Sequence, residues 1–240
     1  MPPGATQGTL VAEYNNLESV EALLKEHECA AVVLEPVVGN SGFIPPTQEF
    51  LEGLRAMTTK YGALLVFDEV MTGFRVGPGG WWTRYEQAPP PDLFAYGKVI
   101  GGGYPLAALA GSAEVMDLLA PAGSVYQAGT LSGNPVAATA GLTTLQNLTA
   151  DSYARVDATA QRVLALASDA LKAAGVAHSA QQAGNLISIF FTEGPVKSMD
   201  DASQQDEEAF ARFFNGMLNR GVSLPPSAYE AWFVSTAHDE

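Results

Sequence analysis

Short apolar runs alternate with amphipathic stretches along the first 149 residues of the chain. Residues 30–34 and 63–67 are apolar runs of strand length, which are typical of strands that a parallel sheet buries on both faces. Between them, Thr47 precedes an amphipathic stretch that predicts a helix as far as Tyr61. This strand–helix–strand order predicts a parallel α/β unit.

Hydrophobic spacing and capping residues predict the remaining elements. Asn134 followed by Pro135 is a strong helix start, because the side chain caps the helix and proline suits its first position. A change in composition near Ala150 predicts a second, smaller α+β unit. In chain order, we expect helices over residues 17–28, 113–119, 135–148, 151–174 and 202–220, and strands over residues 9–11, 92–96, 105–110, 186–191, 222–224 and 232–235.

Asp68 and Lys98 are the two residues that indicate chemistry. Asp68 directly follows the second apolar run, so it lies at the edge where open α/β sheets bind ligands. Lys98 lies between apolar residues and the triple glycine 101–103, although lysine is rarely buried without a partner or a task. A lysine amine forms a Schiff base with an aldehyde cofactor, and a carboxylate keeps that cofactor's ring nitrogen protonated. Together the two residues predict pyridoxal phosphate chemistry.

Each of these residues also has a simpler explanation. An acid at a strand end is often a helix cap or an ion-pair partner, and a lysine beside glycines is often a solvated loop residue. A phosphate-binding P-loop is excluded, because it needs Ser or Thr after the lysine and a glycine five residues before the Gly-Lys pair. This chain has Val99 and Asp92 at those places.

Three loops could contribute further groups. Asn40 lies in the loop 37–46, where its amide suits a polar ligand group such as a ring hydroxyl or serves as a turn residue. Thr130, in the segment 126–135, could hold a phosphate together with backbone amides or could serve only the turn. The long connection over residues 72–91 is typical of a functional or mobile loop.

Composition excludes several classes of partner. The formal net charge of −14 opposes binding to nucleic acid or to anionic membranes, whose phosphates would be repelled. The single Cys29 fits a reducing compartment, and no apolar run approaches the length of a membrane span. His27 has no second ligand at metal-binding spacing, so we expect no metal site. These features predict a cytoplasmic protein that acts on a small molecule.

Four segments resemble the signatures of the fold-type I, class III pyridoxal-phosphate aminotransferases and occur in the same order. They are residues 35–40, 67–74, 96–103 and 126–135. Residues 226–231 resemble the late substrate-side loop of that family. The resemblance covers only the later portion of a family member, so we expect a truncated chain that lacks the principal phosphate loop. It implies a PLP-dependent transferase-like α/β fold, a mostly parallel sheet with helices on both faces. Residues 1–149 would then form the later part of the cofactor domain and residues 150–240 a small α+β C-terminal domain.

The resemblance also implies a role for individual residues. It implies that Lys98 forms the imine and moves protons, and that Asp68 pairs with the nitrogen of the pyridine ring. Asn40 would lie near the ring hydroxyl, and Val70 would pack under the ring. Thr130 would reach the phosphate of the other subunit's cofactor, and Glu230 would lie near the substrate's amino groups. The role of Thr130 requires a homodimer.

Within the family, residues 129–135 together with Asn40 and Glu230 favour an intramolecular amino transfer. The implied reaction uses the pyridoxamine 5'-phosphate form of the cofactor and converts glutamate-1-semialdehyde to 5-aminolevulinate, which feeds tetrapyrrole synthesis. Two alternatives stay open. One is an ω-amino acid:2-oxo acid transaminase, and the other is a catalytically silent chain that only folds or dimerises.

Overall fold

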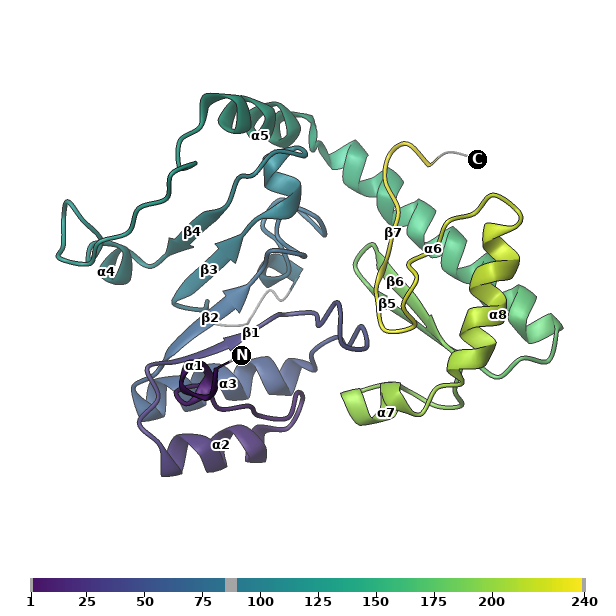
Figure 1. Ribbon diagram of the computed structural model, residues 1–240, viewed down its shortest axis with the longest axis horizontal. Coiled ribbons are helices and arrows are strands. Elements are labelled where there is room, and N and C mark those ends of the chain that lie inside the picture. The colour runs from purple at the N-terminus through teal and green to yellow at the C-terminus, as the bar shows by residue number, and fades with distance from the viewer. Residues whose placement is uncertain (1, 85–89, 239–240) are drawn as a thin grey trace.

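A four-stranded sheet organises the first part of the molecule (Figure 1). The computed structural model describes residues 2–84 and 90–238, so residues 85–89 of the predicted connection, and the last two residues of the chain, lie outside the described residues. The strands are β1 (Ala31–Leu34), β2 (Leu64–Asp68), β3 (Leu93–Tyr96) and β4 (Ala108–Gly111), adjacent in that order. The first three are parallel and β4 is antiparallel, which confirms the predicted mostly parallel sheet.

Two helices pack together on one face of this sheet (Figure 1). They are α2 (Leu17–Glu26) and α3 (Gln48–Tyr61), and both begin as predicted. The Asn16 carboxamide caps α2 by accepting from Ser19 N, and the Thr47 hydroxyl caps α3 by accepting from Phe50 N. Their apolar residues form one core with the inward side chains of β2.

Glycines bring α5 (Pro135–Asn147) against the one-turn 3₁₀ helix η2 (Lys98–Gly101). A Cβ on Gly102 would lie 2.9 Å from Ala140 O, and one on Gly141 would lie 2.4 Å from Ile100 O. Neither position has room for a side chain, so the glycines allow the close contact that supports the turn carrying Lys98. The short elements α1 (Pro3–Thr6), η1 (Trp82–Arg84) and α4 (Ala113–Met116) complete this part of the chain.

A smaller antiparallel sheet forms the second part of the molecule (Figure 1). Its strands are β5 (Ser179–Ala183), β6 (Leu186–Phe190) and β7 (Trp232–Phe233), with α6 (Ala150–Ala173) and α8 (Glu207–Leu218) packed against them. One hydrophobic core joins residues of β6 to residues of β2, so packing crosses the predicted boundary at residue 149, and that domain division stays a prediction. No helix in the described ranges is long and apolar enough to cross a membrane.

Three predictions for these elements were wrong. The helix expected over residues 202–220 is two helices, α7 (Met199–Ser203) and α8, because the Asp206 carboxylate caps a new start by accepting from Ala209 N. Residues 9–11 and 222–224 form no strand. The sequence also gave no sign of β5, whose polar residues are a strand only through pairing with β6.

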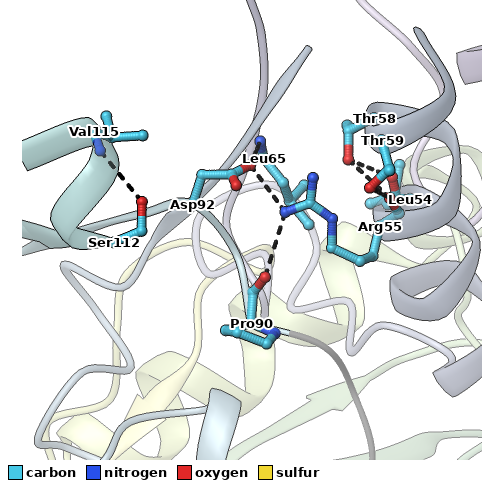
Figure 2. A network of polar contacts seen from close by, with 9 residues as sticks. All are labelled: Leu54, Arg55, Thr58, Thr59, Leu65, Pro90, Asp92, Ser112 and Val115. Carbon is cyan, nitrogen blue, oxygen red and sulfur yellow. Dashed lines mark hydrogen bonds and ion pairs between the residues drawn. The ribbon is translucent and has the colours of Figure 1, made fainter. Parts of the chain in front are cut away.

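Asp92, directly before β3, contacts neighbouring elements, and Figure 2 shows its side-chain contacts with Arg55 and Leu65. Its Oδ2 lies 2.9 Å from Arg55 Nη1 on α3 and accepts from Leu65 N on β2 at 2.6 Å. Its backbone carbonyl accepts from Ser112 N, next to β4, at 3.1 Å. Arg55 and Asp92 are only 15% and 25% exposed, so water replaces these contacts poorly.

We expect Asp92→Ala to lower the free energy of unfolding by about 2 to 3 kcal/mol, because it leaves the Arg55 guanidinium and Leu65 N without their shared acceptor. Urea denaturation followed by circular dichroism measures the change. Asp169→Ala, which removes an exposed acid on α6, is the matched control and should stay within about 0.5 kcal/mol of wild type. Equal stability of the two variants would contradict the role of Asp92.

Candidate active site

Asp68 ends β2 at the carboxyl edge of the sheet, as the sequence predicts. It pairs with Ala95 of β3, and its Oδ1 accepts from Val70 N at 3.0 Å, which fixes the carboxylate. Its side chain is half-buried, and no described residue donates to Oδ2. The arrangement leaves one carboxylate oxygen available to a ligand.

Lys98 lies at the adjacent strand end, directly after β3 and Gly97. The Val70 side chain packs against Gly97, where an added Cβ would lie 3.3 Å from Val70 Cγ1. Lys98 adopts a left-handed backbone with φ of 47°, which is unusual for a residue with a side chain and occurs often at functional sites. Its side chain is exposed, and no hydrogen bond or ion pair joins Nζ to another described residue. The amine is therefore free to react.

Glu35 connects these two residues electrostatically, and sequence reasoning assigned it no role. Burial raises the pKa of the Glu35 carboxyl, the negative charge of Asp68 raises it further, and the positive charge of Lys98 lowers it. Asp68 and Lys98 lie at neighbouring strand ends, and the charges of both act on this one half-buried group. The one available signal was an acid at the end of the β1 run.

Asn40 and Glu230 lie on two loops that contact each other. Asn40 is exposed in a loop that Val38 and Ile44 close by exchanging backbone hydrogen bonds at 3.0 Å. Gly39 O accepts from Ala231 N at 3.2 Å, so the loop carrying Glu230 docks directly on the loop carrying Asn40. A Cβ on Gly39 would overlap Met71, next to Val70, which places this loop pair beside the strand end of Asp68.

Thr130 does not join this group within the chain. It is exposed between α4 and α5, and no hydrogen bond among the described residues links it to Lys98, Asp68 or Asn40. Ser132 N donates to Gly129 O, and the Asn134 side chain caps α5, so the turn is stable without the Thr130 hydroxyl. Its predicted role toward a second subunit stays a prediction.

Glu69 is a second residue that sequence reasoning missed. It is completely buried, and its carboxylate accepts from Thr72 Oγ1 at 2.6 Å, Trp81 N at 2.8 Å and Trp82 N at 3.1 Å. Burial raises the pKa of this carboxyl, although each of the three donors lowers it. A Cβ on Gly80 would lie 2.4 Å from the carboxylate, so only glycine fits there. Glu69 thus holds the described part of the connection against the end of β2.

A comparison with protein families identifies the architecture. The model of the class III aminotransferases matches residues 6–234, nearly the whole chain. This chain belongs to the class III aminotransferase family. The match includes both strand ends with Asp68 and Lys98, and the docked loops with Asn40 and Glu230.

Curated relatives are about twice as long as the chain. A glutamate-1-semialdehyde 2,1-aminomutase of Cutibacterium acnes is 48% identical over 246 residues, which cover 100% of this chain and 56% of that protein. The enzyme of the same name from Propionibacterium freudenreichii subsp. freudenreichii is 48% identical over 244 residues and is covered to 55%. This member of the class III aminotransferases therefore spans little more than half the length of the relatives it matches.

Solved structures confirm the predicted fold class. An ω-transaminase from Sphaerobacter thermophilus matches with a TM-score of 0.85 and 32% identity, over 94% of this chain and 52% of that one. A glutamate-1-semialdehyde aminomutase of Pseudomonas aeruginosa PAO1, in complex with PMP, also has a TM-score of 0.85, with 26% identity over 96% of this chain and 52% of that one. The fold is that of the fold-type I aminotransferases.

We expect Glu69→Gln to lower the free energy of unfolding by about 3 kcal/mol, because an amide nitrogen replaces one of the oxygens that accept three hydrogen bonds. Urea denaturation followed by tryptophan fluorescence measures the loss, since Trp81 and Trp82 flank the site. The control is Glu193→Gln at an exposed acid, which should leave the midpoint unchanged. A Glu69→Gln protein as stable as this control would show that the buried carboxylate does not hold the connection.

Proposed function

We propose that this chain supplies the lysine and the ring-nitrogen partner of a pyridoxal phosphate-dependent aminomutase. The observation that supports this most directly is the placement of Asp68 and Lys98 at neighbouring strand ends, with both charges acting on Glu35. Two related solved structures are complexes with PMP and with PLP, which belong to the same cofactor class.

The residues present fit this cofactor. The Asp68 carboxylate keeps one oxygen for a protonated ring nitrogen, and such a charged hydrogen bond is stronger than a neutral one. Val70 presents an apolar side chain beside Gly97, where it suits one face of a flat ring. Asn40 offers an amide donor and acceptor for the ring hydroxyl on the neighbouring loop.

Lys98 would hold the cofactor through its amine and move protons at the substrate carbon beside it. The bound cofactor supplies an electron sink that stabilises negative charge at that carbon. Among the described residues no ion pair holds Nζ, so the amine would be available to the cofactor and to the substrate. Glu230 enters on the docked loop, where its carboxylate would attract the substrate's amino groups.

For the substrate, we propose glutamate-1-semialdehyde, which would be converted to 5-aminolevulinate for tetrapyrrole synthesis. The names of the two curated relatives, each 48% identical, support this choice. The alternative is an ω-amino acid:2-oxo acid transaminase. It is favoured by the Sphaerobacter thermophilus structure, which is more similar in sequence, at 32%, than the Pseudomonas aeruginosa aminomutase structure, at 26%.

The proposal includes a homodimer in which Thr130 reaches the phosphate of the partner's cofactor. Exposed apolar side chains on both sides of Thr130 support an interface there, among them Val125, Tyr126 and Leu131 at 50%, 82% and 56% exposure. No hydrogen bond among the described residues links Thr130 to the other site residues of its own chain, which fits a role toward a second copy.

We expect pyridoxal phosphate followed by borohydride to leave a stable pyridoxyl adduct on Lys98, which peptide mass spectrometry locates. Lys98→Ala should remove the adduct, whereas Lys172→Ala, at an exposed lysine of α6, should retain it. Asp68→Ala should weaken cofactor binding about 10- to 100-fold, because it removes a hydrogen bond to a charged group. An unmodified Lys98 in the wild-type chain would favour the catalytically silent alternative.

The two candidate reactions differ in what they consume. A chimaera that joins this chain to the unmatched part of the Cutibacterium acnes relative should form 5-aminolevulinate from glutamate-1-semialdehyde with no added 2-oxo acid, because the transfer is intramolecular. Lys98→Ala should lower this rate at least about 100-fold. Turnover of an ω-amino acid that requires a 2-oxo acid, without the aminomutase reaction, would contradict the proposed substrate and favour the transaminase.

A further inference from the structure

The Glu230 loop, defined as residues 226–231, contains no helix or strand, yet several of its backbone groups are held firmly. On one side it contacts the first part of the molecule. Tyr229 O accepts from Gly42 N at 3.1 Å, and Ala231 N donates to Gly39 O at 3.2 Å. Because both bonds join backbone to backbone, they do not depend on the side chains that the two loops carry.

Two buried side chains of the second part of the molecule hold the other side of the loop. Ser188 Oγ, on β6, donates to Glu230 O at 3.2 Å, and Gln205 Nε2, between α7 and α8, donates to Ala228 O at 3.1 Å. Ser188 and Gln205 are only 1% and 6% exposed, so water replaces these donors poorly. The carbonyls of residues 228, 229 and 230 therefore each have a donor.

The position of Ser188 in the sheet explains its contact with Glu230. The last pair between β6 and β7 is Ile187 with Trp232. Ser188 is the next residue of β6, so its hydroxyl donates to the loop just where the pairing of the two strands has ended. Without this hydroxyl, no described residue would donate to the Glu230 carbonyl.

The Glu230 carboxylate remains available in this arrangement. The residue is half-buried, and within residues 2–84 and 90–238 no hydrogen bond or ion pair occupies its carboxylate. A charge that is partly removed from water without a partner is unfavourable, so this carboxylate suits a cationic group such as an ammonium. The backbone bonds on both sides of the loop limit where that charge can lie.

We propose that Ser188 and Gln205 are positioning residues that fix the Glu230 carboxylate for the substrate's amino groups. The inference rests on the proposed function, because it takes Glu230 as the substrate contact. Both side chains act through the loop backbone, on the carbonyl of Glu230 itself and on that of Ala228. Such contacts matter because a displacement of about 1 Å in a substrate-positioning group can lower a rate about 100-fold.

The test uses the chimaera described above and the KM for glutamate-1-semialdehyde. Ser188→Ala and Gln205→Met should each raise the KM about 5- to 10-fold and change kcat less than about twofold, because the charge contact holds the substrate equally before and during the reaction. Ser188→Thr keeps the hydroxyl and should restore the wild-type KM. The matched controls are Ser179→Ala on β5 and Gln204→Met at the exposed neighbouring glutamine, which should leave the KM unchanged.

A double-mutant cycle separates positioning from a general effect on the fold. In a Glu230→Gln background the charge is absent, so Ser188→Ala should then change the KM less than about twofold. Each variant should still form the borohydride-reduced adduct on Lys98. An equal effect of Ser188→Ala with and without the Glu230 charge would overturn the proposal, and so would an unchanged KM in both single variants.

Hydrogen exchange in the chain alone tests the positioning without turnover. Ser188→Ala should make the backbone amides of residues 229–231 exchange at least about fivefold faster, whereas those of β2 and β3 should exchange as in wild type. Unchanged exchange in residues 229–231 would overturn the positioning role alone. A wild-type chimaera without aminomutase activity would instead contradict the proposed reaction, so the two failures are distinguishable.

Discussion

The pairing of β2 with β3 is the constraint on which the candidate site depends. Asp68 lies opposite Ala95, and Glu69 N donates to Ala95 O at 2.9 Å. Parallel strands end at the same edge of a sheet, so this register places the Asp68 carboxylate beside the turn of Lys98, thirty residues later. A slip of one residue would turn Asp68 toward the core and its neighbour Glu69 outward.

The adjacent acids at this strand end perform different tasks because successive side chains point in opposite directions. Asp68 keeps a carboxylate oxygen at the surface, whereas buried Glu69 holds the connection that follows. The carbonyls of Phe74 and Arg75 in that connection accept from Tyr153 and Asn185 in the second part of the molecule. The position of the second sheet, and of the Glu230 loop beside it, therefore depends on the same strand end.

The sequence was informative where structure is determined locally. The capping residues predicted the starts of three helices correctly, at Asn16, Thr47 and Asn134. The apolar runs predicted β1 and β2 in the same way, since each of these elements depends on a few neighbouring residues. The polar β5 depends on its partner strand, and nothing local distinguishes a buried acid such as Glu69 from a solvated one. The sequence was enough to name candidate site residues and to pair Asp68 with Lys98. The roles of these residues concern a cofactor and a substrate, which are not part of this chain, so the roles stay predictions.

The face of the four-stranded sheet opposite α2 and α3 combines two properties that depend on each other. Its centre is apolar and suits a covering layer, and its carboxyl edge carries the half-buried Asp68. A layer over the face would exclude water from that carboxylate, and a charge-assisted hydrogen bond becomes stronger as the local dielectric constant falls. Burial of this face and the binding of a charged ring nitrogen at Asp68 would then favour one another, because coupling between two binding events is reciprocal. Asp68 is thus placed where its surroundings, as well as its own geometry, determine how strongly it holds a charged partner.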